Sequence, residues 1–90
     1  MAEAARWYET QRVGLGTEFL GAVDNAVARI AENLRLGSLV PGVSDRAIRR
    51  RAVSRFPYHV VYMDLSDRLQ ILAVAHDRRR PGYWVGRLPG

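Results

Sequence analysis

Apolar residues recur every three or four positions between Thr17 and Leu34, the spacing that places side chains along one face of an α-helix. The positions on this face are Phe19, Leu20, Val23, Ala26, Val27, Ile30 and Leu34. A helix with one apolar face must bury that face against another element, so the pattern predicts a long helix that covers a core. Thr17 or Gly16 is a suitable N-cap, and Gly37 is a suitable stop signal.

A second helix is predicted over residues 2–12, because this segment consists of strong helix formers and contains neither Gly nor Pro. Ala4, Trp7 and Tyr8 share one face of this helix, and Trp7 and Tyr8 are expected to be core residues. The glycines in segment 14–16 interrupt the helical pattern. Because the link is so short, the two helices are expected to lie antiparallel as a helical hairpin.

The second half of the chain has the pattern of β-strands, after a loop over residues 36–45 that contains Gly, Pro and Ser. Strands are predicted over residues 48–55, 58–65 and 69–76, with a break at Phe56-Pro57 and a turn at 66–68. The last strand is almost continuously apolar, which is typical of a central strand covered on both faces. The sequence therefore predicts an α+β fold in one domain over residues 1–90: an N-terminal antiparallel helical hairpin packed on a small antiparallel β-sheet.

All 14 basic residues are arginines, and the net charge is +5. Residues 1–45 hold four arginines and six acidic residues, whereas residues 46–90 hold ten arginines and three acidic residues. A codon bias would explain the preference for arginine over lysine, but it would act on both halves alike. The asymmetry therefore indicates one anion-binding face in the second half, with nucleic acid or an acidic protein as the partner.

Several classes of function are excluded or made improbable by the composition. The chain has no cysteine, so a disulfide framework, a thiolate metal site and a cysteine nucleophile are excluded. The chain has two histidines, and neither has a carboxylate at the spacing of a metal-binding motif, so no metal site is predicted. No cofactor is expected either. No apolar run approaches the roughly 20 residues needed to span a bilayer, and the N-terminus lacks the pattern of a signal peptide. A cytoplasmic protein without a membrane partner is expected.

Candidate functional residues form two groups at the predicted sheet. The first group follows the last strand and consists of His76, Arg78, Arg79, Arg80, Tyr83 and Trp84. The second group lies on the first strand and consists of Arg49, Arg50, Arg51 and Arg55. Guanidinium groups can bind phosphate in a bidentate manner, and aromatic rings can stack on nucleic-acid bases. The two groups are therefore candidates for a nucleic-acid or partner surface.

Several segments occur in the order typical of one known family: Glu3–Glu9, Gly14–Leu20, Ile48–Arg50, Arg55–Tyr58 and Ala73–His76 through Tyr83–Trp84. In these segments the chain resembles the RelE/ParE superfamily of toxins from bacterial type II toxin–antitoxin systems, also called plasmid-stabilisation proteins. The resemblance implies a helical hairpin on an antiparallel sheet. Family members normally begin with a strand ahead of the first helix, whereas this chain begins within the helix. Either the start of this chain was assigned too late or the chain is truncated at its N-terminus, or the sheet has one strand fewer than in the family. A missing strand would leave an unpaired edge.

The resemblance also implies a function, the arrest of growth by the toxin component of such a system. ParE-like members inhibit DNA gyrase without hydrolytic chemistry of their own, and RelE-like members cut mRNA in the ribosomal A site. Because the sequence does not assign a complete acid–base set, gyrase inhibition is expected first and a ribosome-dependent mRNA endoribonuclease is the alternative. A second alternative is an inactive homologue that acts only as a binding module.

A ribonuclease of this kind needs a base for the 2′-hydroxyl, an acid for the leaving 5′-oxygen and cations for the phosphate. His76 has a suitable pKa range for acid–base work, Arg55 would hold the phosphate, and Tyr83 is the third catalytic candidate. The lysines of many RelE-like nucleases have no counterpart here, and the base stays unassigned. The alternative for His76 is a histidine that closes a strand and hydrogen-bonds the loop beyond it. His59 is expected to be structural or exposed.

The partner implied by the resemblance is a short acidic antitoxin that folds on binding and lays a helix or strand across the toxin. The candidates for contact with the antitoxin or with nucleic acid are Arg49, Arg50, Arg51, Arg78, Arg79, Arg80 and Trp84. Arg49, Arg50 and Arg51 could instead form a face that contacts only solvent. Trp84 could instead cap the end of the sheet. The target would be DNA gyrase or the ribosome with its mRNA.

Overall fold

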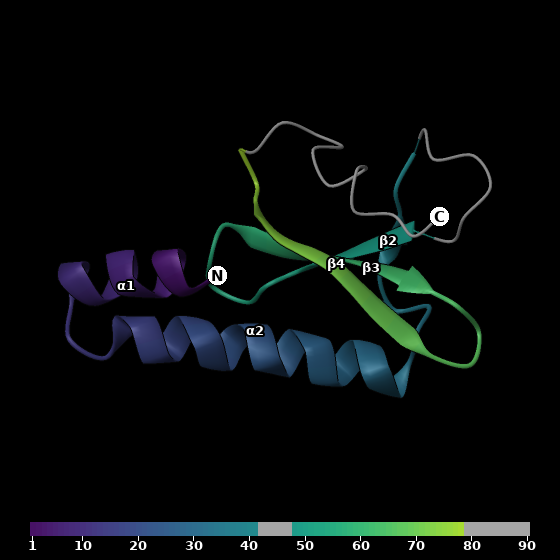
Figure 1. Cartoon of the computed structure of the whole chain (residues 1–90), viewed down its shortest axis with the longest axis horizontal. Coiled ribbons are helices and arrows are strands. Elements are labelled where there is room, and N and C mark those ends of the chain that lie inside the picture. The colour runs from purple at the N-terminus through teal and green to yellow at the C-terminus, as the bar shows by residue number, and fades with distance from the viewer. Residues whose placement is uncertain (42–47, 79–90) are drawn as a thin grey trace.

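The computed structural model describes residues 1–41 and 48–78. Its elements are α1 (Ala2–Gln11), α2 (Leu15–Glu32), β1 (Ser38–Leu39), β2 (Ile48–Ala52), β3 (Tyr58–Asp64) and β4 (Leu69–His76). α2 runs along the sheet, and α1 folds back beside the first half of α2 (Figure 1). The predicted α+β class, with a helical hairpin packed on a small antiparallel sheet, is confirmed. Among the described residues, neither helix is long and apolar enough to cross a lipid bilayer.

The link between the two helices is held by one carboxylate. Glu9 accepts hydrogen bonds from the amides of Gly14 (2.9 Å) and Gly16 (3.0 Å), which lie at the start of α2. Gly14 is the N-cap and has a φ of 90°, a conformation that few residues other than glycine adopt. α2 therefore begins at Leu15, ahead of the position predicted from Thr17, because the cap comes from the preceding helix and not from the link itself.

The sheet has the order β1-β2-β3-β4, and all neighbouring strands are antiparallel. β3 is central and contains four consecutive buried residues, Val60–Met63. The prediction that residues 69–76 form the central strand is wrong, since β4 has β3 as its one neighbour in the sheet described. A continuous apolar run does not distinguish a central strand from an edge strand whose two faces are covered. β1 lies within the predicted loop, where Ser38 pairs with Arg50.

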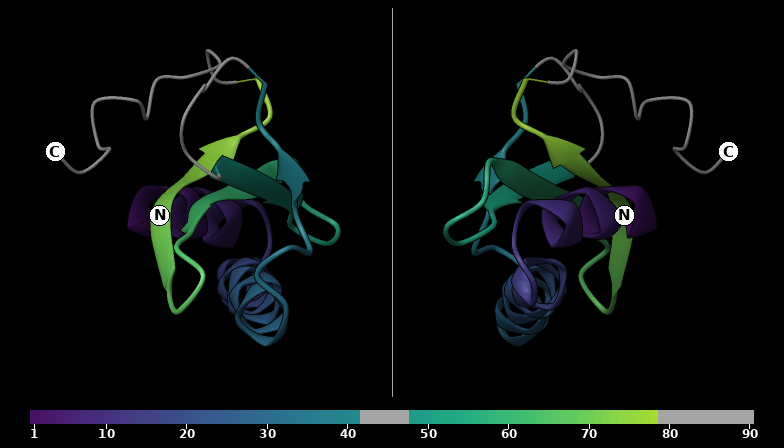
Figure 2. Two further views of the ribbon diagram at one scale, coloured as in Figure 1. Left: turned by 90° about the vertical axis from the view of Figure 1, so that its right-hand side faces the viewer. Right: turned by 90° about the vertical axis from the view of Figure 1, so that its left-hand side faces the viewer.

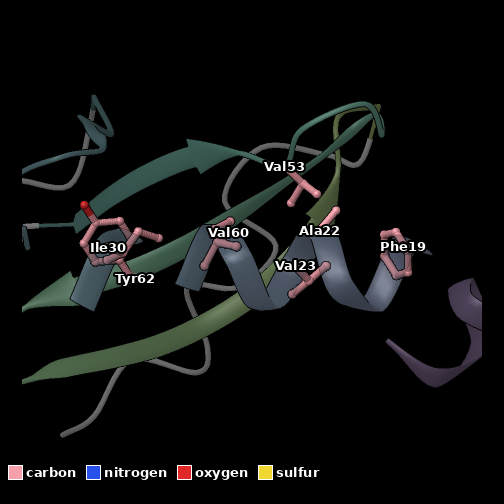
Figure 3. Close-up of a cluster of buried hydrophobic side chains, with 8 residues drawn as sticks. Phe19, Ala22, Val23, Ile30, Val53, Val60 and Tyr62 are labelled. Carbon is pink, nitrogen blue, oxygen red and sulfur yellow. The ribbon is translucent and has the colours of Figure 1, made fainter. Parts of the chain in front are cut away.

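α2 lies along one side of the sheet (Figure 2). The main core lies between the helices and the sheet (Figure 3). Its buried residues are Phe19, Ala22, Val23, Ala26, Ile30, Val53, Val60 and Tyr62. A second buried cluster consists of Ile48, Val61, Met63, Leu72 and Ala73. Tyr8 packs against the main core as predicted, but Trp7 is 59% exposed. Trp7 is therefore not a core residue, because Tyr8 already occupies the position against Phe19 and Phe56.

Candidate functional site

The three consecutive arginines of β2 point to different parts of the molecule, because side chains alternate between the two faces of a strand. Arg49 lies opposite Tyr62, and Arg51 lies opposite Val60. Tyr62 and Val60 both belong to the core beneath the helices, so Arg49 and Arg51 share the helix-facing side of the sheet. Arg50 is exposed on the opposite side. The run of arginines is therefore not a single basic surface.

Arg49 is part of the internal structure. Its Nη1 donates a hydrogen bond to the carbonyl of Gly37 at 2.8 Å and a longer one to the carbonyl of Arg35 at 3.4 Å. Its Nε lies 3.9 Å from Oδ2 of Asp64 and is buried without a hydrogen-bond partner. Only 17% of the Arg49 side chain and 12% of the Asp64 side chain are exposed. Arg49 thus ties the segment after α2 to the sheet and offers little surface to a ligand.

A polar hollow of about 350 Å³ lies on the side of the sheet that faces away from the helices. It is lined by Ser38, Arg50, Ala52, His59 and Asp77. Strand pairing brings these residues together, since Ser38 lies opposite Arg50 and His59 lies between Ala52 and Ala75. The hollow therefore combines a guanidinium, an imidazole, a carboxylate and a hydroxyl from four segments of the chain.

His59 and Asp77 form a hydrogen-bonded pair in this hollow. Nδ1 of His59 lies 3.0 Å from Oδ1 of Asp77, and the side chain of His59 is 18% exposed. An ionised carboxylate can only accept a hydrogen bond, so this contact requires a proton on Nδ1 of His59. In the neutral imidazole, the lone pair is then on Nε2, which is the arrangement in which a carboxylate orients a histidine as a general base.

His76, the catalytic histidine predicted from the sequence, lies on the other face of the sheet. It is opposite Tyr58, and the two rings contact each other edge to face with centroids 5.0 Å apart. Its Nδ1 accepts a hydrogen bond from the amide of Arg78 at 3.0 Å. His76 thus makes the contact expected of a histidine that closes a strand and bonds the loop beyond it. His59 and His76 cannot serve the same pocket from opposite faces.

The other predicted site residues are dispersed or lie outside the described part. Arg55 is exposed in the turn between β2 and β3, with a φ of 69°, and is not among the residues that line the hollow. Arg78 is exposed directly after Asp77. Arg79, Arg80, Tyr83 and Trp84 lie outside the described residues.

The pairing of His59 with Asp77 is the feature that the sequence reasoning misses. The two residues are 18 positions apart and become neighbours through the β3–β4 hairpin, in which His59 lies opposite Ala75. A signal was present, because the predicted turn at 66–68 places the start of one strand beside the end of the next. The pair is missed when His59 is considered alone, because its partner is recognised only together with the residues on the neighbouring strand.

Among the described residues, no group of three or more His, Asp or Glu side chains is placed to hold a metal ion. Comparisons of the chain with protein-family models, with curated proteins and with solved structures found no match.

Proposed function

We propose that the protein is the toxin component of a type II toxin–antitoxin pair of the RelE/ParE type, and that it arrests growth by cleaving RNA. The observation that supports RNA cleavage is the position of Arg50 in the same hollow as the His59–Asp77 pair. The sequence favours gyrase inhibition only because it assigns no general base. His59 is a candidate for that base, and this supports the ribonuclease.

The chemistry that the hollow supports is attack of a ribose 2′-hydroxyl on the adjacent phosphate. Nε2 of His59 takes the proton of the hydroxyl, and Asp77 holds the imidazole in the required tautomer. Arg50 binds the phosphate and stabilises the negative charge that develops on it. The products are a 2′,3′-cyclic phosphate and a 5′-hydroxyl. The described lining holds no further acid–base side chain, so the leaving oxygen takes its proton from water, and the imidazolium of His59 then gives its proton to the hydroxide that forms.

RNA fits this site better than DNA for a chemical reason. The reaction uses the 2′-hydroxyl as its nucleophile, and DNA lacks this group. The hollow is also small, about 350 Å³, and open at the surface of the sheet, so it suits one splayed nucleotide and its phosphate better than a duplex. The predicted antitoxin partner remains part of the proposal, because a growth-arresting enzyme requires neutralisation in the cell that makes it.

The proposal is tested by induced expression in a bacterial host with mapping of mRNA 5′ ends, using wild type, His59→Ala and His76→Ala. We expect cleavage by wild type and by His76→Ala, and at least about 100-fold less cleavage by His59→Ala. Circular dichroism and thermal unfolding of the purified variants check that they fold. Loss of cleavage in His76→Ala with full activity in His59→Ala would move the catalytic role back to His76.

A supercoiling assay with purified gyrase distinguishes the alternatives. Inhibition of gyrase by the wild-type chain with intact mRNA in the cell would replace the ribonuclease by a gyrase inhibitor. Growth arrest without either effect would contradict both targets. Normal growth under induction, with a folded protein, would leave the inactive binding module as the function.

A further inference from the structure

The turn that follows β4 is closed by the side chain of His76. Nδ1 of His76 accepts a hydrogen bond at 3.0 Å from the amide of Arg78, two residues further along the chain. A side-chain acceptor that bonds the amide two residues on fixes the backbone between them, as asparagine and aspartate do in Asx turns. The residue between them is Asp77, the partner of His59 in the hollow. His76 therefore acts on the backbone of a residue of the hollow, although its own ring lies on the other face of the sheet.

Asp77 is held in place through its backbone. Its amide donates a hydrogen bond to the carbonyl of Pro57 at 2.8 Å, and the following amide, that of Arg78, is bound by His76. The side chain of Asp77 is more than half exposed, so packing restrains the carboxylate little. The two bound amides fix the direction in which this side chain leaves the backbone, toward Nδ1 of His59. Loss of the bond at Arg78 would remove one of the two restraints and let the carboxylate move away from the imidazole.

His76 is itself kept in place by the aromatic part of the main core. Its ring meets that of Tyr58 edge to face, with centroids 5.0 Å apart, and the two residues are opposite each other in the β3–β4 pair. The ring of Tyr58 packs in turn on Phe19 of α2, with centroids 4.9 Å apart. The position of the His76 acceptor is thus set by packed rings. The turn after β4 connects this packing to the hollow on the opposite face.

The hydrogen bonds assign opposite tautomers to the two histidines. Nδ1 of His76 accepts from a backbone amide, so in the neutral ring the proton is on Nε2. Nδ1 of His59 faces a carboxylate and carries the proton, which leaves the lone pair on Nε2. The tautomer of each ring is therefore set by one contact. The two contacts are made by adjacent residues of the turn, the side chain of Asp77 and the amide of Arg78.

We propose that His76 is a positioning residue: its Nδ1 holds the turn at Asp77, and through Asp77 it keeps the proton of His59 on Nδ1. This role differs from the acid–base role that the sequence suggests for His76, because His76 neither touches the RNA nor transfers a proton. The effect of His76 on RNA cleavage rests on the proposed function of the hollow. Its effect on the tautomer of His59 does not.

Three replacements of His76 separate its acceptor from its ring. His76→Asn keeps an acceptor, because Oδ1 of asparagine stands in the place of Nδ1 and can bond the amide of Arg78. His76→Phe keeps an aromatic ring against Tyr58 but has no acceptor, and His76→Ala has neither. Thermal unfolding checks that each variant folds. The ¹⁵N chemical shifts of the imidazole nitrogens, measured at about pH 8.5, where histidines are ordinarily neutral, report the tautomer.

The chain has two histidines, so in every variant at position 76 the imidazole signals belong to His59. In wild type we expect the proton on Nδ1 of His59 and on Nε2 of His76. His76→Asn should leave the tautomer of His59 unchanged, whereas His76→Phe and His76→Ala should give a mixture of both tautomers. We expect RNA cleavage to be about tenfold slower in His76→Phe and His76→Ala and nearly unchanged in His76→Asn. His76→Ala should therefore still cleave RNA faster than His59→Ala does.

Three results would overturn the proposal: a proton on Nδ1 of His76 in wild type, an unchanged tautomer of His59 in a folded variant without the acceptor, or a mixture of tautomers in His76→Asn. Slow cleavage by His76→Phe with an unchanged tautomer of His59 would return His76 to the reaction itself. The tautomers are measured without RNA. A chain that shows the expected tautomers but cleaves no RNA would contradict the ribonuclease and leave the positioning role of His76 in place.

Discussion

Nδ1 of His59 lies 3.0 Å from Oδ1 of Asp77, and this contact joins the start of β3 to the residue that follows β4. The backbone fixes both partners. His59 is held in the sheet between Ala52 and Ala75, and the amide of Asp77 donates a hydrogen bond to the carbonyl of Pro57 at 2.8 Å. The carboxylate is thus brought to the imidazole by the hairpin, although 55% of the Asp77 side chain is exposed.

Replacement of Asp77 by asparagine tests whether the pair has a chemical role. The amide of asparagine can donate a hydrogen bond to Nδ1, which places the proton of the imidazole on Nε2 and removes the lone pair that a base needs. We expect Asp77→Asn to cleave RNA at least about 100-fold more slowly than wild type, with nearly unchanged stability. RNA cleavage assays and urea unfolding give the two quantities. An unchanged rate would show that the carboxylate does not set the tautomer.

The separation of the arginines on β2 predicts opposite phenotypes for neighbouring positions. Arg49→Ala removes a charged hydrogen bond to the carbonyl of Gly37 and leaves Asp64 without its cation, so we expect a loss of about 2 kcal/mol in the free energy of unfolding. Arg50→Ala should change this free energy by less than about 0.5 kcal/mol, because Arg50 is exposed. It should instead reduce RNA cleavage at least about tenfold. Similar unfolding curves for both variants would contradict the internal role of Arg49.

The packing of the segment after α2 can be tested at Gly37, which is buried, with the exposed Gly21 as a matched control. The amide of Gly37 donates to the hydroxyl of Tyr62 at 2.8 Å, and a Cβ at Gly37 would lie 2.6 Å from the carbonyl oxygen of Arg50. We expect Gly37→Ala to destabilise the fold by about 1–3 kcal/mol. Gly21 lies within α2 with no atom within 4 Å of such a Cβ, so Gly21→Ala should stabilise by about 0.5–1 kcal/mol. Denaturant unfolding measures both, and equal effects would contradict the close packing at Gly37.

Local patterns predicted the elements well and their neighbours less well. The strand over residues 69–76 has the predicted bounds, because its apolar run and the turn before it are both local signals. Among the described residues this strand lies at the edge of the sheet. That position depends on which strands pair, and no local signal encodes the pairing. β1 illustrates the same limit. Its two residues become a strand because Tyr62 and Arg49 hold the neighbouring Gly37 against the sheet.

The candidate site was predicted from residue types, and the structure places several of those residues according to strand alternation. The sequence shows that arginines are concentrated in the second half of the chain, but strand alternation places the side chain of Arg49 inside and that of Arg50 in the hollow. His76 was selected because this residue ends a strand, whereas His59 gains its partner from the residue that follows another strand. A pair of this kind is visible only when the register of the hairpin is known.

The raised pKa of Tyr8 predicts how the free energy of unfolding changes at alkaline pH. Burial raises the pKa of Tyr8 above its ordinary value near 10, and the neighbouring Tyr58 raises this pKa further. The folded protein therefore holds the phenol proton more tightly than the unfolded chain does. The resulting contribution to stability is complete below the pKa of the unfolded chain and is lost as the pH rises through the higher pKa of the folded state.

The variant Tyr8→Phe keeps the ring against Phe19 and Phe56, with centroids at 5.1 and 5.0 Å, and removes the ionisable group. We expect its free energy of unfolding to fall less steeply than that of wild type between about pH 8 and about pH 11. Urea unfolding at several pH values in this range measures the two slopes. At about pH 8 the phenol of Tyr8 is neutral in the folded and in the unfolded state, so a difference there reports only the removal of the hydroxyl. Parallel curves for wild type and Tyr8→Phe up to about pH 11 would mean that the phenolate is as well accommodated in the folded state as in the unfolded chain.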